Sequence, residues 1–529
     1  MLSRILQKTS AAAAAARRLS TRAVAPATET LLRDRLDADG GKLTNGSATG
    51  DKLNKSSAAE DRLTKPSAGG DLRRRLFSLV YAKQSAVVTI QKWKEEGILV
   101  TKSDLSRIVR ELRRLKRYKY ALEICEWMRT QDDIKLLPGD YATHLDLIAK
   151  TQGLKSAKKF FEDLPEETRG LATYTTLLST YVEHKQADSA ETIMKKMSEC
   201  NFPKSPSPYN HMMSLYLTTG QLEKIPETID ELKKTTSPNL FTYNLWLAFC
   251  GSQNFTEKAE KVFLELNEAK IEPNWVTYST LASIYIKNSN PEKAELALKH
   301  MEQKLSRKFR EGYSSLLSLH ANLENEEEVI RIWKKIKSTF STLKDSEYTC
   351  VISSLVKLNE FEVAEKLYAE WESISPSKDS RIPNLLLAAY INNNDNMEKA
   401  EAFYDRIVKK VIRPAYTTYE LLTWGYLKGK EIDKVLDSFE KMVKSVRKWD
   451  PDEKLVQEVF GIVEKFGNVD EAEKLAVTLL QAGYVNVEIY KCLLRKAGKM
   501  ALTVEEMMKK DKVEMDKEIK GLVQLMSKK

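Results

Sequence analysis

The chain has 529 residues, of which 30% are charged and 42% hydrophobic, and its formal net charge is +10. One hydrophobic core rarely serves a chain of this length, so we expect several domains or an array of repeats. Sparse glycine and proline, 20 and 15 residues, disfavour an all-β fold with many turns. No apolar run approaches the length that crosses a membrane.

The first 28 residues have the composition of an organelle transit peptide. They hold five basic residues and no acidic one, and Leu2, Ile5 and Leu6 can line one face of a basic amphipathic helix. An arginine already at position 4 favours the mitochondrion over the chloroplast, and the alternative is a disordered cytosolic tail. Removing this segment leaves a net charge of +10 − 5 = +5, so charge alone does not establish nucleic-acid binding.

Residues 29–70 form a second region of low complexity. A short pattern of Asp, a basic residue and Leu begins at positions 34, 51 and 61, with small polar residues between the copies. Such a segment cannot bury enough apolar surface to offset the entropy of ordering it, so we expect a flexible, disordered tether.

From about residue 71 the chain repeats itself with a period near 35. The anchors are tyrosines at this spacing: Tyr174, Tyr209, Tyr243, Tyr278, Tyr313, Tyr348 and, two periods later, Tyr419. Sixteen residues after each anchor lies a mostly small apolar residue: Ala190, Ile225, Ala259, Ala294, Val329, Ala364 and Val435. Twenty-three residues after it lies a larger one: Met197, Leu232, Leu266, Met301, Ile336, Trp371 and Met442. A fixed period of this length predicts a solenoid of stacked units.

Each unit contains two amphipathic segments, and we expect an all-α fold of about 11–12 helix-turn-helix units. In the unit anchored at Tyr243, the first helix is predicted from Thr242 to about Gly251. A polar turn follows, and Thr256 is predicted to cap the second helix.

The pattern resembles the pentatricopeptide repeat of plant organellar proteins, in its P type. The matching residues include Thr242-Tyr243-Asn244 with Ile271-Glu272-Pro273-Asn274, and Val276-Thr277-Tyr278 with Ala294-Glu295. The tetratricopeptide repeat needs small residues four and twenty-three positions after the anchor, where this chain has mostly bulky ones, Ala282 excepted. The resemblance implies a right-handed superhelical solenoid over residues 71–500, followed by a charged helical tail at 501–529.

The resemblance also implies that single-stranded RNA binds along the first helices, roughly one base per unit. In the family, the residue after the anchor and the last residue of the unit select the base. Carried over, Asn210 with Asn239 and Asn244 with Asn274 favour a pyrimidine, cytidine first, and Thr349 with Asp379 favours guanosine. Phe241 and Val276 occupy the position that packs between bases. Thr175 with Ser205 is carried over as a purine reader, and Asn384 with Ala415 as a pyrimidine reader.

Several units depart from this code. Phe309 and Lys344 stand at selecting positions, Glu311 and Arg381 replace the apolar wedge, and Glu420 falls opposite Asp452. These departures favour an alternative: a structural protein of the mitochondrial ribosome that contacts rRNA and ribosomal proteins without strict readout.

A basic stripe is the second candidate RNA contact. Arg107, Arg110, Arg114 and Arg117 follow helical spacing along one predicted first helix, where they can grip phosphates. The alternative is a merely solvated face.

Catalytic and metal-binding patterns are missing from the sequence. We find no phosphate-binding loop, Ser/His/Asp arrangement or dinucleotide turn, and expect no enzyme activity, cofactor or small-molecule substrate. The five cysteines lie at least 50 residues apart, and we interpret them as reduced thiols in the core rather than zinc ligands or disulfides.

Overall fold

The computed structural model confirms the all-α prediction. It describes residues 68–79, 85–202, 205–374, 380–392, 397–410 and 413–484, with residues 486, 487, 489–491, 508 and 519, and these contain helices and no strand. The predicted transit peptide, most of the predicted tether and Asp379 lie outside this part. The chain divides into two compact units at residues 301 and 302, and each is described by itself.

The first unit contains the helices from α3 onward. Their bounds are α3 Ala68–Phe77, α4 Ala86–Glu95, α5 Lys102–Arg114, α6 Tyr118–Arg129, α7 Pro138–Gln152, α8 Leu154–Asp163, α9 Leu171–Glu183, α10 Ala187–Glu199, α11 Ser207–Thr219, α12 Ile225–Thr235, α13 Leu240–Ser252, α14 Thr256–Glu268, α15 Trp275–Lys287 and α16 Pro291–Lys304, whose end lies in the second unit. Two short 3₁₀ turns, Glu166–Thr168 and Leu222–Lys224, precede α9 and α12.

The second unit contains the helices from α17 onward. Their bounds are α17 Arg310–Asn322, α18 Glu326–Thr339, α19 Asp345–Lys357, α20 Phe361–Ile374, α21 Arg381–Asn392, α22 Met397–Lys409, α23 Tyr416–Gly429, α24 Ile432–Lys444, α25 Glu453–Phe466 and α26 Val469–Gln481. No helix in the described part of the chain combines the length and apolarity needed to cross a bilayer.

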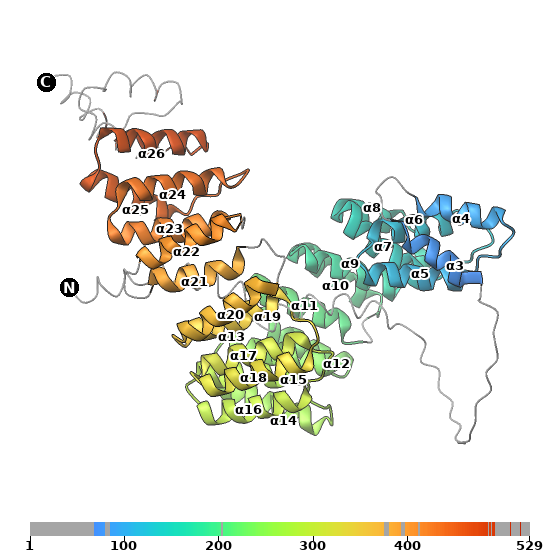
Figure 1. Cartoon of the computed structure of the whole chain (residues 1–529). Coiled ribbons are helices and arrows are strands. Elements are labelled where there is room, and N and C mark those ends of the chain that lie inside the picture. The colour runs from blue at the N-terminus through green and yellow to red at the C-terminus, as the bar shows by residue number, and fades with distance from the viewer. Residues whose placement is uncertain are drawn as a thin grey trace. The chain divides into compact units, whose positions relative to one another are not determined.

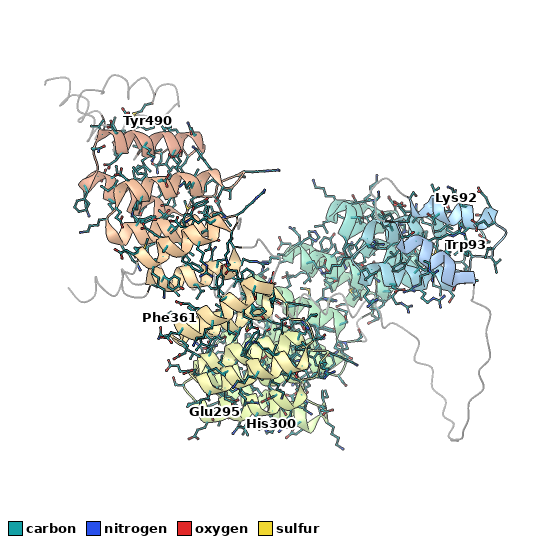
Figure 2. All side chains as sticks on the ribbon, viewed as in Figure 1. Lys92, Trp93, Glu295, His300, Phe361 and Tyr490 are labelled. Atoms are coloured by element: carbon teal, nitrogen blue, oxygen red, sulfur yellow. The ribbon has the colours of Figure 1, made fainter. Side chains whose placement is uncertain are left out.

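Consecutive helices pair, as the period predicts. The 24 described α-helices from α3 to α26 make twelve pairs, in agreement with the predicted 11–12 units (Figure 1). Within each of the two compact units, the first helix of one pair packs against the first helix of the next pair, as α11 does on α13 and α17 on α19. The side chains of neighbouring helices interleave between the ribbons (Figure 2).

The periodic apolar residues form the core. All seven residues sixteen positions after an anchor are fully buried, and all seven at position twenty-three are at most 1% exposed. The two positions are seven residues apart, or about two turns, so both lie on the face that the second helix turns toward the first. Burying one such large side chain stabilises the fold by about 1.5–3 kcal/mol, so each pair is held mainly by its packing against neighbours.

The turns inside the pairs use left-handed residues, most of which are not glycine. Asn254, Ser289, Glu324 and Lys430 all have φ between 54° and 58°. This conformation lets the next amide close a bond to a carbonyl in the preceding helix, as Asn290 N–H does to Tyr285 at 2.9 Å. The prediction that Thr256 caps α14 is wrong, because Phe255 occupies the cap position and Thr256 is the first helical residue.

Candidate nucleic-acid interface

The two predicted asparagine pairs come together in the fold. Asn210 on α11 donates through Nδ2 to Oδ1 of Asn239, 3.3 Å away, and Asn244 on α13 donates likewise to Asn274 at 3.4 Å. Each pair joins the first helix of one unit to the start of the first helix of the next. The contact is possible because adjacent first helices pack directly against each other.

Asn239 and Asn274 also cap helices. Oδ1 of Asn274 accepts from the backbone N–H groups of Val276 and Thr277, both at 3.1 Å, and Asn239 caps α13 through Thr242 N–H at 2.9 Å. Asn239 and Asn274 therefore act as helix caps and at the same time form the predicted pairs. Because the oxygens are engaged, the Nδ2 groups of Asn239 and Asn274 are the atoms that retain hydrogen-bonding capacity, with no acceptor among the described residues.

A buried threonine orients two of the first-helix asparagines. The hydroxyl of Thr277 donates to Oδ1 of Asn244 at 2.7 Å, and Thr418 donates to Oδ1 of Asn384 at 2.9 Å. Neither asparagine is more than 7% exposed. Sequence reasoning missed this contact, although the signal was present as a threonine directly before the anchor tyrosine.

Asn210 differs from these two residues. Its side chain is 3% exposed, and its Oδ1 has no hydrogen-bond partner in the described structure. A buried amide oxygen without a partner is costly, so a donor that reached it after neighbouring groups moved would be stabilising.

The other predicted base contacts are less complete. Val276 is only 3% exposed, so a base could pack on its side chain only if neighbouring groups moved, whereas Phe241 is half-buried. The Thr349 hydroxyl bonds back to the carbonyl of Asp345 at 2.7 Å, and its partner Asp379 is not described.

The predicted arginine stripe is shorter than expected. Helix α5 ends at Arg114, and Arg117 lies beyond it, donating through Nη1 to the carbonyl of Phe77 at 2.7 Å. The assignment of Arg117 to the helical stripe is therefore wrong, because the turn carries it back toward α3. Arg107, Arg110 and Arg114 do lie on α5 and are exposed.

Acidic neighbours partly neutralise the charge of two of these three arginines. Arg107 pairs with Asp104 at 2.7 Å, and Arg114 lies 3.8 Å from Glu111. The Arg73 guanidinium hydrogen-bonds to Glu111 and lowers the pKa of that carboxyl. Arg110 has no ion pair among the described residues, so it is the cation most available to a phosphate.

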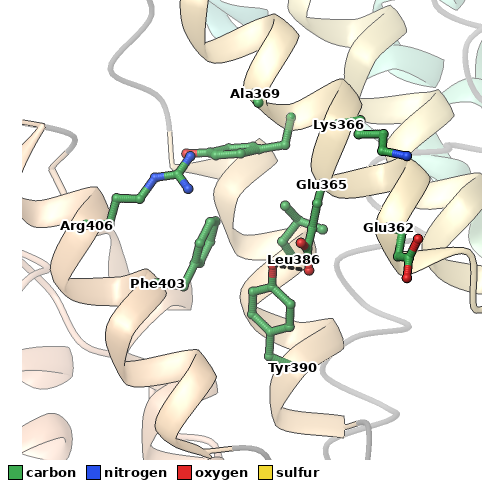
Figure 3. Close-up of a pocket in the computed structure, with 9 residues that line it drawn as sticks. Glu362, Glu365, Lys366, Ala369, Leu386, Tyr390, Phe403 and Arg406 are labelled. Atoms are coloured by element: carbon green, nitrogen blue, oxygen red, sulfur yellow. Dashed lines mark hydrogen bonds between the residues drawn. The ribbon is translucent and has the colours of Figure 1, made fainter.

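A recurring ionic junction also escaped the sequence reasoning. A glutamate on a second helix accepts from a tyrosine and a lysine of the next pair. Glu365 accepts from Tyr390 at 2.9 Å (Figure 3) and from Lys399 at 2.5 Å. The same glutamate-to-tyrosine spacing, with a lysine one residue nearer, recurs in Glu191, Tyr216 and Lys224; Glu260, Tyr285 and Lys293; and Glu401, Tyr426 and Lys434. Burial and the adjacent carboxylate raise the pKa of Tyr285 to about 12.

A cavity of about 440 Å³ beside this junction lies between α20, α21 and α22 (Figure 3). Phe403 and Leu386 line it together with Glu365 and Arg406. Two of its charged groups are already paired, because Glu365 accepts from Tyr390 and Lys399 and Arg406 bonds to Glu372 at 2.8 Å. We therefore regard the cavity as part of the packing between units.

The described cysteines are mostly core residues. Cys125, Cys250 and Cys350 are buried, and burial raises the pKa of the Cys125 thiol to about 12. The core interpretation is wrong for Cys200, which is exposed where α10 ends. No cluster of metal-binding side chains occurs among the residues that the structure describes.

The family models and two relatives that match this chain describe pentatricopeptide repeats. The model described as "Pentatricopeptide repeat domain" matches residues 206–253, and that described as "PPR repeat" matches residues 172–202, 241–271, 276–304 and 348–374. The mitochondrial pentatricopeptide repeat-containing protein At4g02820 of Arabidopsis thaliana is 52% identical over 456 residues, which are 86% of each chain. A second mitochondrial relative from Arabidopsis thaliana is 32% identical over 81% of this chain and 86% of its own.

A solved structure with a similar chain is maize PPR10 in complex with an 18-nt psaJ RNA element. It is 17% identical, with 86% of this chain and 77% of that chain covered and a TM-score of 0.44. The relatives confirm the mitochondrial localisation predicted from the N-terminal composition.

Proposed function

Because the chain belongs to the pentatricopeptide repeat family, we propose that it binds single-stranded RNA in mitochondria and thereby acts in RNA metabolism or translation. The observation that carries this proposal is the repeated contact between an asparagine on one first helix and the asparagine that caps the next. Two such pairs in successive units present amide groups at a regular interval, which suits the Watson–Crick edges of bases splayed from a single strand.

The hydrogen-bonding capacity at the asparagine pairs favours cytidine. The free Nδ2 groups of Asn239 and Asn274 are donors, and the Watson–Crick edge of cytosine offers acceptors at N3 and O2. The N4 amino group of cytosine can in turn donate to the unpartnered Oδ1 of Asn210. Thr349 with Asp379 is proposed as a guanosine reader, and Phe241 and Val276 as contacts to the base faces.

Phosphate binding is assigned to α5. Arg107, Arg110 and Arg114 are exposed on one helix, and their charge gives affinity without base preference. Family membership also makes the chain a non-catalytic protein, as predicted. Residues 1–28 are proposed as the transit peptide, 29–70 as a tether whose last three residues already belong to α3, 71–500 as the solenoid and 501–529 as a helical tail.

A second candidate function is a structural role on the mitochondrial ribosome. Glu420 lies on first helix α23, and Asp452 caps first helix α25 through Lys454 N–H at 3.1 Å. These carboxylates would repel a phosphate backbone and suit a basic protein surface instead. Sedimentation of the native protein with the ribosome on sucrose gradients, persisting after nuclease trimming of mRNA, would favour this role.

The proposed function is tested by ultraviolet crosslinking of the tagged chain to RNA in isolated mitochondria, followed by sequencing of the attached RNA. We expect enrichment of a small set of transcripts, and the same RNA should bind the purified chain. Replacing both Asn244 and Asn274 with alanine should relax the preference for a pyrimidine at one position. Failure of the purified chain to bind any crosslinked RNA would overturn the proposal.

A further inference from the structure

The start of α17 carries an exposed aromatic residue where other units carry a base-selecting asparagine. Phe309 is the N-cap residue of α17 and lies four residues before the anchor Tyr313, as Asn239 and Asn274 lie before their anchors. Its side chain is 40% exposed. A phenyl ring cannot read a base through hydrogen bonds, but its face can stack on any base.

Cationic residues precede Phe309 in the chain and also occur at the start of the next first helix. Arg307 and Lys308 are exposed in the loop before α17, and neither has an ion pair among the described residues. Lys344 is exposed at the same N-cap position of α19, one pair later. The loop therefore combines an aromatic face with unneutralised positive charge, which is the composition of contacts to single-stranded nucleic acid.

Nearby acids are largely neutralised by other groups. Glu302 is bound by Arg331 at 2.7 Å and by Lys335 at 2.6 Å. The other acids near these cations that are not buried in the described structure are Glu311, exposed on the first turn of α17, and the half-buried Asp345, which accepts from Trp371 Nε1 at 2.8 Å. The three cations named above outnumber them. The local balance thus stays positive, and a phosphate is attracted to the loop.

Arg310 holds the starts of α17 and α19 together. Its Nη1 lies 2.9 Å from Oε1 of the buried Glu347, and its Nη2 donates to the carbonyl of Thr342 at 2.7 Å. The guanidinium also stacks over Phe340, 4.1 Å from the ring centroid. Phe309 directly precedes Arg310, and Lys344 lies between Thr342 and Glu347 in the chain. The contacts of Arg310 therefore hold the backbone positions of Phe309 and Lys344 fixed relative to each other.

We propose that Phe309, Arg307, Lys308 and Lys344 form a sequence-independent contact to single-stranded RNA, in which Phe309 stacks on a base and the cations neutralise adjacent phosphates. The inference rests on the proposed function and deepens it. It assigns affinity, rather than base selection, to two units that depart from the asparagine pattern. The chain would then hold RNA continuously across units that read bases and units that do not.

The test uses the full chain and three fluorescein-labelled 20-nucleotide RNAs, oligocytidylate, oligouridylate and oligoadenylate, with affinity measured by fluorescence anisotropy. Phe309→Ala should weaken binding to all three by the same factor, about 5- to 150-fold, as expected for one lost stacking contact. Phe309→Trp should retain the affinity because its ring also stacks. Binding weakens as salt rises, so the slope of log affinity against log salt is negative. The double change Arg307→Ala and Lys308→Ala should make this slope less steep by about 1.4.

Phe466→Ala is the matched control. Phe466 is 58% exposed, and Lys430 lies over its ring at 5.3 Å, but it ends α25 rather than starting a first helix. Circular dichroism verifies that each variant folds. If the wild type binds RNA and Phe309→Ala binds all three RNAs equally well, this inference alone is wrong. If Phe309→Ala loses ribosome sedimentation while its RNA affinity is unchanged, the surface contacts protein and the inference also fails. A wild type that binds no RNA would overturn the proposed function itself.

Discussion

Replacing Asn274 with aspartate should separate its two roles, because one atom caps α15 and the other faces the proposed base. An aspartate oxygen still accepts from Val276 N–H, Thr277 N–H and Asn244 Nδ2, which now lie 3.1, 3.1 and 3.4 Å from Oδ1. The cap is therefore kept, since Asp and Asn are about equally good N-caps. The second group changes from a donor to an acceptor, which matches N3–H of uracil instead of N3 of cytosine.

We expect Asn274→Asp to move the preference at one RNA position from cytidine to uridine. A good base contact is worth about 1–3 kcal/mol by analogy with DNA readout, or roughly 5- to 150-fold in relative affinity. Asn274→Ala should lose both the preference and the cap, at a cost of about 1 kcal/mol. Hydrogen exchange at the start of α15 should then be roughly five-fold faster.

The assay pairs randomised-RNA selection, which reports base preference, with hydrogen-exchange mass spectrometry of α15. Asn325→Asp is the control, because Asn325 caps the second helix α18 through Glu328 N–H at 3.2 Å and should alter no base preference. If Asn274→Asp retains the cytidine preference while exchange at α15 is unchanged, the amide acts only as a cap and the base-reading argument is refuted.

Four further predictions concern charge and backbone geometry. Changing Arg107, Arg110 and Arg114 to alanine should weaken binding to all RNAs alike and lower the salt slope by about 2, and an unchanged slope would exclude α5 from phosphate binding. Arg117→Ala should leave that slope unchanged but destabilise α3 by about 1–3 kcal/mol, because the Phe77 carbonyl loses a charged donor; faster proteolysis near α3 would report this. Hydrogen bonds from Arg331, followed by those from Lys335, lower the pKa of Glu302 to about 2, so its stabilising effect is complete above pH 4.5 and is lost as the pH falls toward 2. Glu302→Gln should accordingly lower the melting temperature at pH 7 and by progressively less below pH 4.5, whereas an equal deficit at pH 3 would contradict this origin. Ser289→Gly should raise stability by about 0.5–1 kcal/mol in thermal unfolding, because φ of 54° strains a residue with a side chain; a lower melting temperature would show that the turn is not strained.

The sequence by itself determined the helical array and its core. The positions sixteen and twenty-three residues after the anchor are all buried because period and amphipathicity are local properties, and stacking gives every unit the same neighbours. Composition likewise predicted the mitochondrial localisation that the relatives confirm. The asparagine pairs were also found from register, since a contact that recurs once per unit has nearly the same sequence separation each time, 29 residues in one pair and 30 in the other.

Only the tertiary structure decided how each side chain divides its hydrogen bonds. In the sequence, Arg117 continues the helical spacing of the other arginines. In the structure α5 ends three residues earlier, and the turn directs the Arg117 guanidinium to the carbonyl of Phe77. Asn274 looks like a base reader or a cap, and the geometry makes it both, because its oxygen points into the helix start while its amino group remains available. The Arg310 bridge to Glu347 and Thr342 joins residues more than 30 positions apart. Arginine and glutamate at these two positions do not recur at the other tyrosine anchors, so no repeated sequence pattern predicts the bridge. Periodicity specifies which residues face the core, whereas the partner of a polar group depends on where individual helices end and how closely they approach.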